Sequence, residues 1–396
     1  MAAALTFAEL LAPMTVDAFF EEHHGRRWAH IEGASDRFAD AMPWARFNEL
    51  LGMTGYWTGE SLRLSLDGNP VPVHRYCDTE SGQDVPRLMR PLPSKVMALL
   101  RQGAVLVAGG ADSAVPGIAR IADALETELG TTATCSVVCS ARQRPGRPAR
   151  FDVHDVYIVQ VQGEKRWDIY QNRVDAPVPH SGYLRGLQSV PDGGAGDLAT
   201  QFVTRPGDVL YIPRGQYYEA ASLDSASLHF AFGIMAFTGL EFMQTLIVQA
   251  VYDPVFRQNF PRAAEGGEAL QAHLATLSER IQATAADPGF VSRFAAYQQT
   301  KMSARGGYTL PIDADAPVYR VADRQFRVEQ TDSRCFLVGP KGRVEIPAVV
   351  NAPVRWIIEA EAFTEADLAE NHPDLAGDER AKLLTDLGGM KVIERV

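Results

Sequence analysis

Residues 149–167 read ARFDVHDVYIVQVQGEKRW, and this stretch decides the fold class. Every residue from 156 to 161 except Gln160 is β-branched or aromatic, and such residues are enriched in strands. Gly163 then breaks the run, as a glycine between two strands commonly does. We predict two neighbouring β-strands, one on each side of this turn.

Short segments of the same character continue on both sides of this pair. They are rich in β-branched and aromatic residues, and turn residues such as Pro206-Gly207-Asp208 separate some of them. Many short strands at close spacing favour a double-sheet jelly roll, whose closure leaves few exposed sheet edges. The predicted strands lie within 132–140, 150–162, 165–171, 200–205, 208–214, 217–222 and 227–237.

The chain before these strands is expected to be mainly helical. LTFAELLAP (5–13) and TVDAFFEEH (15–23) carry apolar residues three and four positions apart. VPGIARIADALETELG (115–130) is the clearest helix, because its apolar residues form one face and Gly130 can end it. We therefore predict an α+β protein in which residues 1–238 form a jelly-roll domain with N-terminal helices.

Two further regions follow the predicted jelly roll. Residues 239–306 contain two helical patterns whose apolar faces need a partner, either the barrel or a second subunit. We expect this helical region to form the interface of a homodimer. Residues 307–396 predict strands, three short helices and a closing strand, as in a winged-helix-like domain. From Tyr308 onward 16 acidic residues stand against 11 basic ones, so nucleic-acid binding by this domain is not expected.

The overall composition narrows the function classes. The 396 residues carry a net charge of −11, which argues against broad binding to nucleic acid. No run of about 18 apolar residues occurs, so we expect no membrane-spanning helix. Residues 1–28 lack the basic start of a secretory signal. Four cysteines without metal-ligand spacing favour a reducing compartment, and we expect the protein to be cytoplasmic.

The blocks DVYIVQVQGEKRW (155–167) and PGDVLYIPRG (206–215) resemble the cupin-4 branch of the Jumonji-C oxygenases, which includes the ribosomal-protein hydroxylases. The resemblance extends over nearly the whole chain. It implies a double-stranded β-helix of the cupin type, a helical dimerisation region and a winged-helix-like tail. It also implies iron(II) and 2-oxoglutarate as cofactors. Two histidines and a carboxylate, arranged as His-x-Asp and PRG-x-x-His-x-Ala, would bind the iron.

Two of these three iron ligands differ in this chain. Arg150-Phe151-Asp152 stands where the family has His-x-Asp, and Tyr218 stands where the second histidine is expected. Arginine is a permanent cation that binds no metal, and tyrosine binds iron(II) poorly until it loses a proton at a pKa of about 10. We therefore predict that an Arg150–Asp152 ion pair, with Tyr218 nearby, fills the space of the iron. No metal or cofactor is then expected at this site.

On this interpretation the chain is a non-iron relative that binds a peptide, a protein or a small anionic ligand. The alternative is an active iron(II)- and 2-oxoglutarate-dependent hydroxylase of protein or peptide side chains. That activity would need a shifted ligand set, Asp152, His154 and His229, which offers two histidines and one carboxylate. A third possibility is metal-free acid–base chemistry by Tyr218, Glu219 and Asp152.

Further residues bear on ligand binding. The resemblance places Lys165 where a basic residue holds the distal carboxylate of 2-oxoglutarate, so Lys165 is a candidate to bind that molecule or another anion. The asparagine that the family often has in the preceding strand is replaced by Ser136. The loop at 141–150 could recruit an acidic peptide or a phosphate group through Arg142, Arg144, Arg147 and Arg150.

Overall fold

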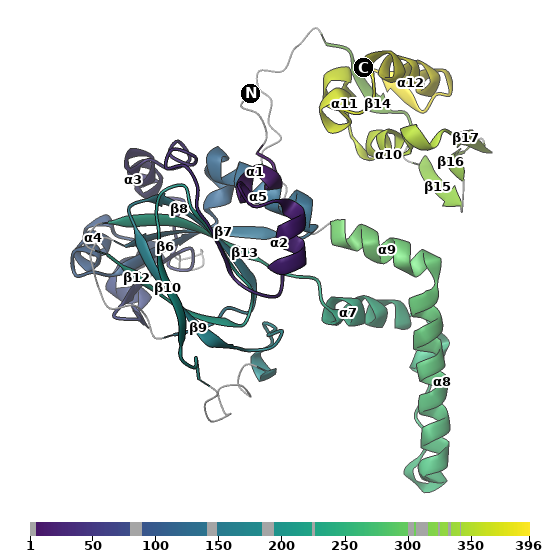
Figure 1. Cartoon of the computed structure of the whole chain (residues 1–396). Coiled ribbons are helices and arrows are strands. Elements are labelled where there is room, and N and C mark those ends of the chain that lie inside the picture. Colours follow the sequence, from purple (N-terminus) through teal and green to yellow (C-terminus); the bar gives the residue numbers. More distant parts are fainter. Residues whose placement is uncertain are drawn as a thin grey trace. The chain divides into compact units, whose positions relative to one another are not determined.

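The computed structural model describes residues 5–79, 89–140, 149–183, 194–223, 226–299, 305, 316–323, 325–331, 334–340 and 342–396. The chain divides into two compact units, Met1–Gly307 and Tyr308–Val396. The first unit combines antiparallel sheets with helices (Figure 1), which confirms a mixed helix and sheet fold with a large antiparallel sheet. Arg142, Arg144 and Arg147 lie outside the described residues.

Two antiparallel sheets form the centre of the first unit. The larger has eight strands in the order β1-β11-β8-β13-β7-β6-β2-β3, and the smaller has three in the order β10-β9-β12. The strands of the larger sheet are β1 (Ala29–Ile31), β2 (Leu62–Leu66), β3 (Asn69–Pro70), β6 (Val105–Gly109), β7 (Ala133–Ser140), β8 (Asp155–Gln162), β11 (Val209–Ile212) and β13 (Ser227–Ile234). Those of the smaller sheet are β9 (Lys165–Arg173), β10 (Leu198–Thr204) and β12 (Gln216–Ser222), and β4 (Cys77–Thr79) pairs with β5 (Met89–Pro91).

Strand β8 explains why the sequence at 155–162 is so apolar. Tyr157 and Val159 belong to the core between the larger sheet and the N-terminal helices. Val156 and Ile158 belong to a second core, which they share with residues of the smaller sheet. Because successive side chains of a strand point to opposite faces, a strand buried on both faces has a nearly continuous apolar run.

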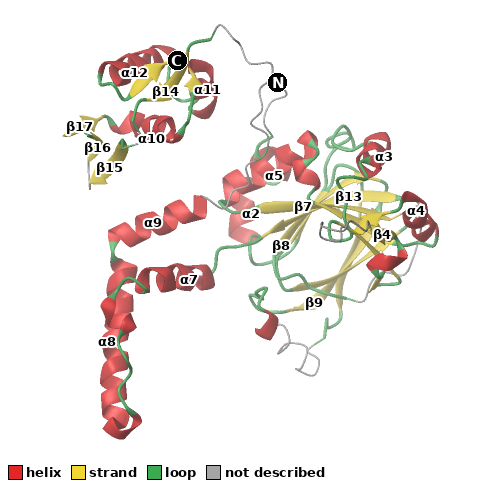
Figure 2. Ribbon diagram, turned by 180° about the vertical axis from the view of Figure 1, so that it is seen from behind, coloured by secondary structure: helices red, strands yellow, loops and turns green. Residues whose placement is uncertain are grey.

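Helices cover the outer face of the larger sheet (Figures 1 and 2). They are α1 (Phe7–Leu11), α2 (Val16–Glu22) and α5 (Pro116–Leu129), while α3 (Trp44–Gly52) and α4 (Pro93–Arg101) also pack on the same core. Helix α5 ends at Gly130, whose φ of 63° is left-handed and favours glycine. The sequence prediction of this helix and of its end is therefore confirmed.

A helical segment follows the last strand of the barrel. It comprises α7 (Gly239–Ala250), α8 (Gly266–Ala286) and α9 (Pro288–Gln299), with two short 3-10 turns, Pro254–Arg257 and Ala263–Glu265, between α7 and α8. Phe242 of α7 packs edge-on against Phe290 and Phe294 of α9, with ring centroids 5.8 and 6.0 Å apart. These aromatic contacts join the first and last helices of the segment.

The second unit has its own hydrophobic core of leucine, isoleucine, valine and phenylalanine side chains. Its helices are α10 (Asn351–Glu359), α11 (Glu365–Asn371) and α12 (Gly377–Gly389). One small sheet holds β14 (Val318–Val321), β18 (Phe363–Thr364) and β19 (Ile393–Arg395), and another holds β15 (Arg327–Thr331), β16 (Arg334–Gly339) and β17 (Gly342–Ile346). The three predicted helices and the closing strand are present, while the winged-helix assignment stays a prediction. Within the described residues, no helix is long and apolar enough to cross a membrane.

Candidate functional site

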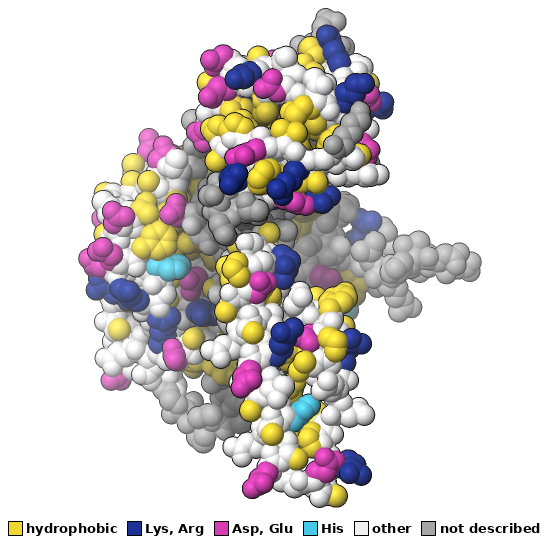
Figure 3. Space-filling model, turned by 90° about the vertical axis from the view of Figure 1, so that its right-hand side faces the viewer, with side chains coloured by type: hydrophobic (Ala, Val, Ile, Leu, Met, Phe, Trp, Pro, Cys, Tyr) yellow, Lys and Arg dark blue, Asp and Glu magenta, His cyan; other side chains and the backbone are white. Residues whose placement is uncertain are grey.

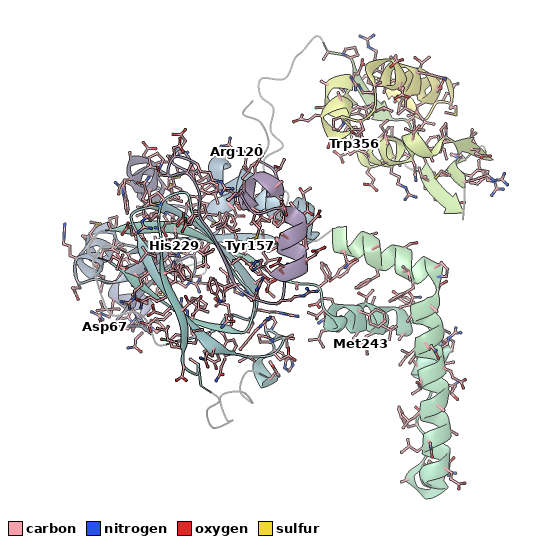
Figure 4. All side chains as sticks on the ribbon, in the orientation of Figure 1. Asp67, Arg120, Tyr157, His229, Met243 and Trp356 are labelled. Atoms are coloured by element: carbon pink, nitrogen blue, oxygen red, sulfur yellow. The ribbon has the colours of Figure 1, made fainter. Side chains whose placement is uncertain are left out.

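A cavity of about 130 Å³ lies between the two sheets, and several candidate residues line it. Arg150, Lys165 and Tyr218 from the sequence analysis contribute to its wall, as does His229 of β13, which Figure 4 shows inside the barrel. Apolar side chains of β8 and β9, including Val156 and Trp167, form much of the remaining wall. The structure thus brings together cationic and aromatic groups from distant parts of the sequence.

The backbone of Arg150 is fixed by strand β12. Arg150 and Tyr218 form an isolated antiparallel bridge, in which Arg150 N donates to Tyr218 O at 3.0 Å and Tyr218 N donates to Arg150 O at 2.8 Å. Two residues further, Gly215 N donates to Asp152 O at 2.8 Å. These bonds place the segment 150–152 beside β12 and set the positions of its side chains.

Tyr218 lies between the two charged groups of this segment. Its hydroxyl donates to Asp152 Oδ2 at 2.6 Å, and the Arg150 Cζ lies 4.8 Å from the centre of its ring, a cation–π distance. Burial and the Asp152 carboxylate raise the pKa of the Tyr218 hydroxyl, while the Arg150 guanidinium lowers it by a smaller amount. The phenol therefore keeps its proton and acts as a donor.

This arrangement refines the predicted ion pair. Among the described residues, no ion pair joins Arg150 directly to Asp152, and the phenol of Tyr218 connects them instead. The structure brings the three residues together, but the phenol lies between the two charged groups, which the prediction did not foresee. The backbone pairing explains this, because Arg150 and Tyr218 lie directly opposite each other. The Arg150 guanidinium therefore stacks on the Tyr218 ring and not beside the Asp152 carboxylate.

Lys165 lies at the other end of the cavity. It is 3% exposed, and its Nζ donates to Ser140 Oγ at 2.8 Å and to Ser222 Oγ at 3.0 Å. Neither serine was a candidate from the sequence, where Ser136 was considered instead. A period-two reading of β12 could have found Ser222, because Tyr218 and Ser222 are four residues apart and therefore share a face.

His229 is a buried imidazole on the cavity wall. It is 4% exposed, and its Nδ1 has no hydrogen-bond partner. The Trp167 ring meets it edge-on with centroids 5.7 Å apart. Burial first, and then the charges of Lys165 and Arg150, hold the pKa of His229 well below its usual value. The imidazole is neutral at pH 7 and presents an unpaired polar atom inside the barrel.

The shifted iron site, Asp152 with His154 and His229, is not assembled. The His154 ring packs against the backbone of Gly233, where a Cβ would lie 2.7 Å from its Cδ2. Gly233 and His229 both belong to β13 and are four residues apart, which is about 13 Å at about 3.3 Å per residue. Across the residues described, no three histidine, cysteine or carboxylate side chains are grouped so that they could hold a metal ion.

The position that the resemblance implies for the iron does not suit iron(II) either. The groups there are a guanidinium, a protonated phenol and a carboxylate, and Asp152 already accepts the phenol's hydrogen bond. Iron(II) in a facial triad needs two imidazoles and a carboxylate with free lone pairs. The residues present therefore do not fit the metal, whereas the ammonium of Lys165, held by two hydroxyls, suits a carboxylate.

The acid–base set of Tyr218, Glu219 and Asp152 is also divided. Glu219 follows Tyr218 on β12 and so points to the opposite face, where its Oε2 accepts a hydrogen bond from the Tyr170 hydroxyl at 3.1 Å. Tyr218 and Asp152 remain in contact without it. The geometry does not support proton transfer by the three residues acting as one site.

Comparison with known proteins agrees with this architecture. Residues 113–242 match the family described as JmjC domain. The uncharacterized protein YxbC of Bacillus subtilis (strain 168) is 25% identical over 329 residues, covering 75% of this chain and 94% of that protein. The bifunctional lysine-specific demethylase and histidyl-hydroxylase NO66 of Drosophila persimilis is 25% identical over 237 residues, 57% of this chain and 31% of that protein. The chain thus matches less than a third of this last relative's length.

A solved structure shares the fold over nearly the full chain. It is YcfD, a ribosomal oxygenase from Escherichia coli in complex with cobalt and 2-oxoglutarate, and it aligns with a TM-score of 0.54. The sequences are 16% identical, and the alignment covers 97% of this chain and 98% of the other. The likeness concerns the fold, and the residues of the site decide what this chain binds.

Proposed function

We propose that this chain, whose JmjC domain is related to those of the ribosomal oxygenases, is a metal-independent binding protein and not an iron oxygenase. The observation that carries the proposal is the contact set of Arg150, Tyr218 and Asp152. The Tyr218 hydroxyl donates to Asp152, and the Tyr218 ring faces the Arg150 guanidinium. The barrel then serves to bind a small anionic ligand, a peptide or a protein.

The electrostatics at this position oppose a divalent cation. A guanidinium stays charged at all relevant pH values, so it repels a second cation placed beside it. If Asp152 bound a metal in place of this hydrogen bond, the Tyr218 hydroxyl would lose its acceptor. Tyr218 is only 5% exposed, so water does not readily replace that acceptor. An unsatisfied buried polar group costs about 1–3 kcal/mol.

Metal titration tests this proposal directly. Purified chain, stripped with a chelating resin, is titrated with cobalt(II) and iron(II) under nitrogen and followed by calorimetry and elemental analysis. We expect no stoichiometric binding by the wild-type chain. Stoichiometric iron at the barrel would overturn the proposal.

A back-substituted variant calibrates the metal titration. Arg150→His with Tyr218→His restores two imidazoles beside Asp152, and we expect this double variant to take up cobalt(II). Tyr218→Phe is the matched control, because it removes the hydroxyl without supplying a metal ligand. Uptake by Tyr218→Phe equal to that of the double variant would show that the histidines are not what binds the metal.

The helical segment supports a homodimer as the working form. Helices α7 and α8 and the turn between them expose a series of large apolar side chains, which Figure 3 shows in yellow on this part of the chain. Ile247 is 60% exposed and Val248 is 65% exposed. Apolar patches of this kind mark interaction surfaces, and a second copy offers a matching patch.

The cysteines support a reducing environment, and we assign the protein to the cytoplasm. All four are free thiols, and all four are buried. Burial raises the pKa of the Cys139 thiol to about 11, so this thiol is not reactive at neutral pH.

A further inference from the structure

We infer that the second unit binds an extended basic peptide, which adds as a strand to the outer edge of β17 and lays its apolar side chains into a groove between β17 and α12. The inference concerns this unit alone, so it goes beyond the proposed function of the barrel and does not depend on the metal content there. Three observations carry it: an edge strand, an apolar groove beside that strand, and an acidic lining of the groove.

Strand β17 lies at the edge of its sheet. The strand order is β15-β16-β17, and β16 pairs with β17 from Cys335 opposite Ile346 to Gly339 opposite Gly342 (Figure 1). Among the described strands, none pairs with the other side of β17. Alternate residues of an edge strand direct N–H and C=O groups away from the sheet, where a further strand can bond to them. A peptide that adds here would gain these backbone hydrogen bonds.

The groove lies beside this edge. It has a volume of about 480 Å³ and is lined by residues of β17, of the 3-10 turn Ala348–Val350 and of α12. Val344 and Ile346 share one face of β17, but Ile346 is 7% exposed and Val344 is 51% exposed. Val349 and Met390 of the lining are 65% and 39% exposed. The apolar face of β17 thus continues beyond the part that the core covers, as is typical of an interaction surface.

The charges of the described lining favour a basic partner. Three carboxylates, Glu345, Glu379 and Asp386, line the groove with one cation, Lys382. Glu379 and Asp386 are seven residues apart on α12, which is about 10.5 Å at about 1.5 Å per residue. Glu345 lies 3.8 Å from Arg334, and this exposed pair contributes little energy. Lysine side chains of a peptide in the groove would therefore meet carboxylates of complementary charge.

A second cavity limits where the basic side chains can lie. It has a volume of about 340 Å³ and shares Val344 and Met390 with the groove. Its described lining has two cations, Arg343 and Lys391, and one carboxylate, Asp323. The excess of carboxylates belongs to the groove, so the lysines of the peptide should lie beside α12 and not beside the turn between β16 and β17.

Fluorescence anisotropy with the full chain tests the inference. The probe is a fluorescein-labelled peptide of seven alternating lysine and valine residues, and the same peptide with glutamate in place of lysine is its charge control. We expect the lysine peptide to bind at least tenfold more tightly than the glutamate peptide, because only its charges complement the groove. No binding of the lysine peptide, or equal binding of the two, would overturn the inference.

Backbone methylation separates strand addition from attraction by charge alone. Two further versions of the lysine peptide carry N-methyl groups, one version on every valine and the other on every lysine. Only alternate N–H groups of an added strand face β17. One version should therefore bind at least tenfold more weakly than the unmethylated peptide, and the other should stay within about threefold of it. Equal binding of the two versions would rule out strand addition.

Variants locate the site. Val344→Lys and Val349→Lys each place a cation in the groove, and each should weaken binding of the lysine peptide at least tenfold. Val396→Lys is the matched control, because Val396 is 73% exposed and lies outside the groove lining, and it should change binding by less than about threefold. Unchanged binding by both groove variants would contradict the location. A lower mass of Val344→Lys in light scattering would show that a second copy occupies the groove, and would overturn the peptide assignment.

Discussion

Tyr218 shows how one side chain sets the character of the site. Its hydroxyl donates to Asp152, and its ring carries the guanidinium of Arg150. An imidazole at this position would offer a lone pair to a cation, whereas the phenol offers a proton to a carboxylate. Under the proposed function, this phenol and the guanidinium on its ring stand where the resemblance implies a metal-binding imidazole.

His229 is expected to make the fold sensitive to mild acid. Its pKa is lowered in the folded chain by burial, while an unfolded histidine titrates near 6.5. Above that pH both states are neutral. As the pH falls below about 6.5, the unfolded chain takes up a proton that the folded chain does not, so the free energy of unfolding decreases. From pH 6.5 to 5.5 this loss amounts to about 1 kcal/mol for one group.

Urea unfolding of wild type and His229→Gln at these two pH values measures the effect. We expect the wild type to lose about 1 kcal/mol more than the variant. The pKa of His24 is also lowered by burial, but His24 is present in both proteins and cancels in the difference. His74→Gln, which removes an exposed imidazole, is the control. Equal losses in wild type and His229→Gln would contradict the assignment.

Part of this site could be predicted from the sequence. The resemblance implied that Arg150, Asp152 and Tyr218 lie close together, and the structure finds them in contact. Which of these three side chains contacts which could not be predicted, because side-chain torsions decide among partners that are equally near. The pairing of Lys165 with Ser140 depends on how two sheets face each other, and no spacing in the sequence encodes that distance.

At the scale of elements, Arg305 ties the chain beyond the helical segment to helix α5 and to the turn before it. Its side chain is 4% exposed and donates to Asp112 at 2.9 Å, to Asp123 at 3.0 Å and to Glu126 at 2.8 Å. Arg305→Met removes the guanidinium that pairs with the buried Glu126 and Asp112. Removing one partner of a buried ion pair costs about 3–5 kcal/mol, and we expect a loss of that size in urea unfolding.

Two further variants test whether charge is the cause. Arg305→Met combined with Glu126→Gln should recover part of the loss, because the variant no longer buries that carboxylate. Arg293→Met is the control, since its guanidinium is 58% exposed and lies 3.9 Å from Asp287. We expect the control to change stability by about 0.5 kcal/mol or less. A loss with Arg293→Met as large as with Arg305→Met would contradict a specific role.

The strands and helices were easier to predict than this contact. Strand β8 and helix α5 follow from local spacing and from glycines that end them. Arg305 stands 179 positions from Glu126, and nothing local in either segment points to the other. Sequence periodicity reports which face is buried, but it does not report which distant element buries it.

For the whole molecule, the exposed apolar face of α7 and α8 predicts a dimer. Light scattering after gel filtration should give twice the chain mass of 43.3 kDa. Ile247→Glu with Leu274→Glu should shift the mass to one chain, since burying two carboxylates in an apolar interface is unfavourable. Ala272→Glu is the control, because 100° per residue places it opposite Leu274 on α8. A monomeric wild type would contradict the predicted dimer. A double variant that stays dimeric would show that the interface does not involve these side chains.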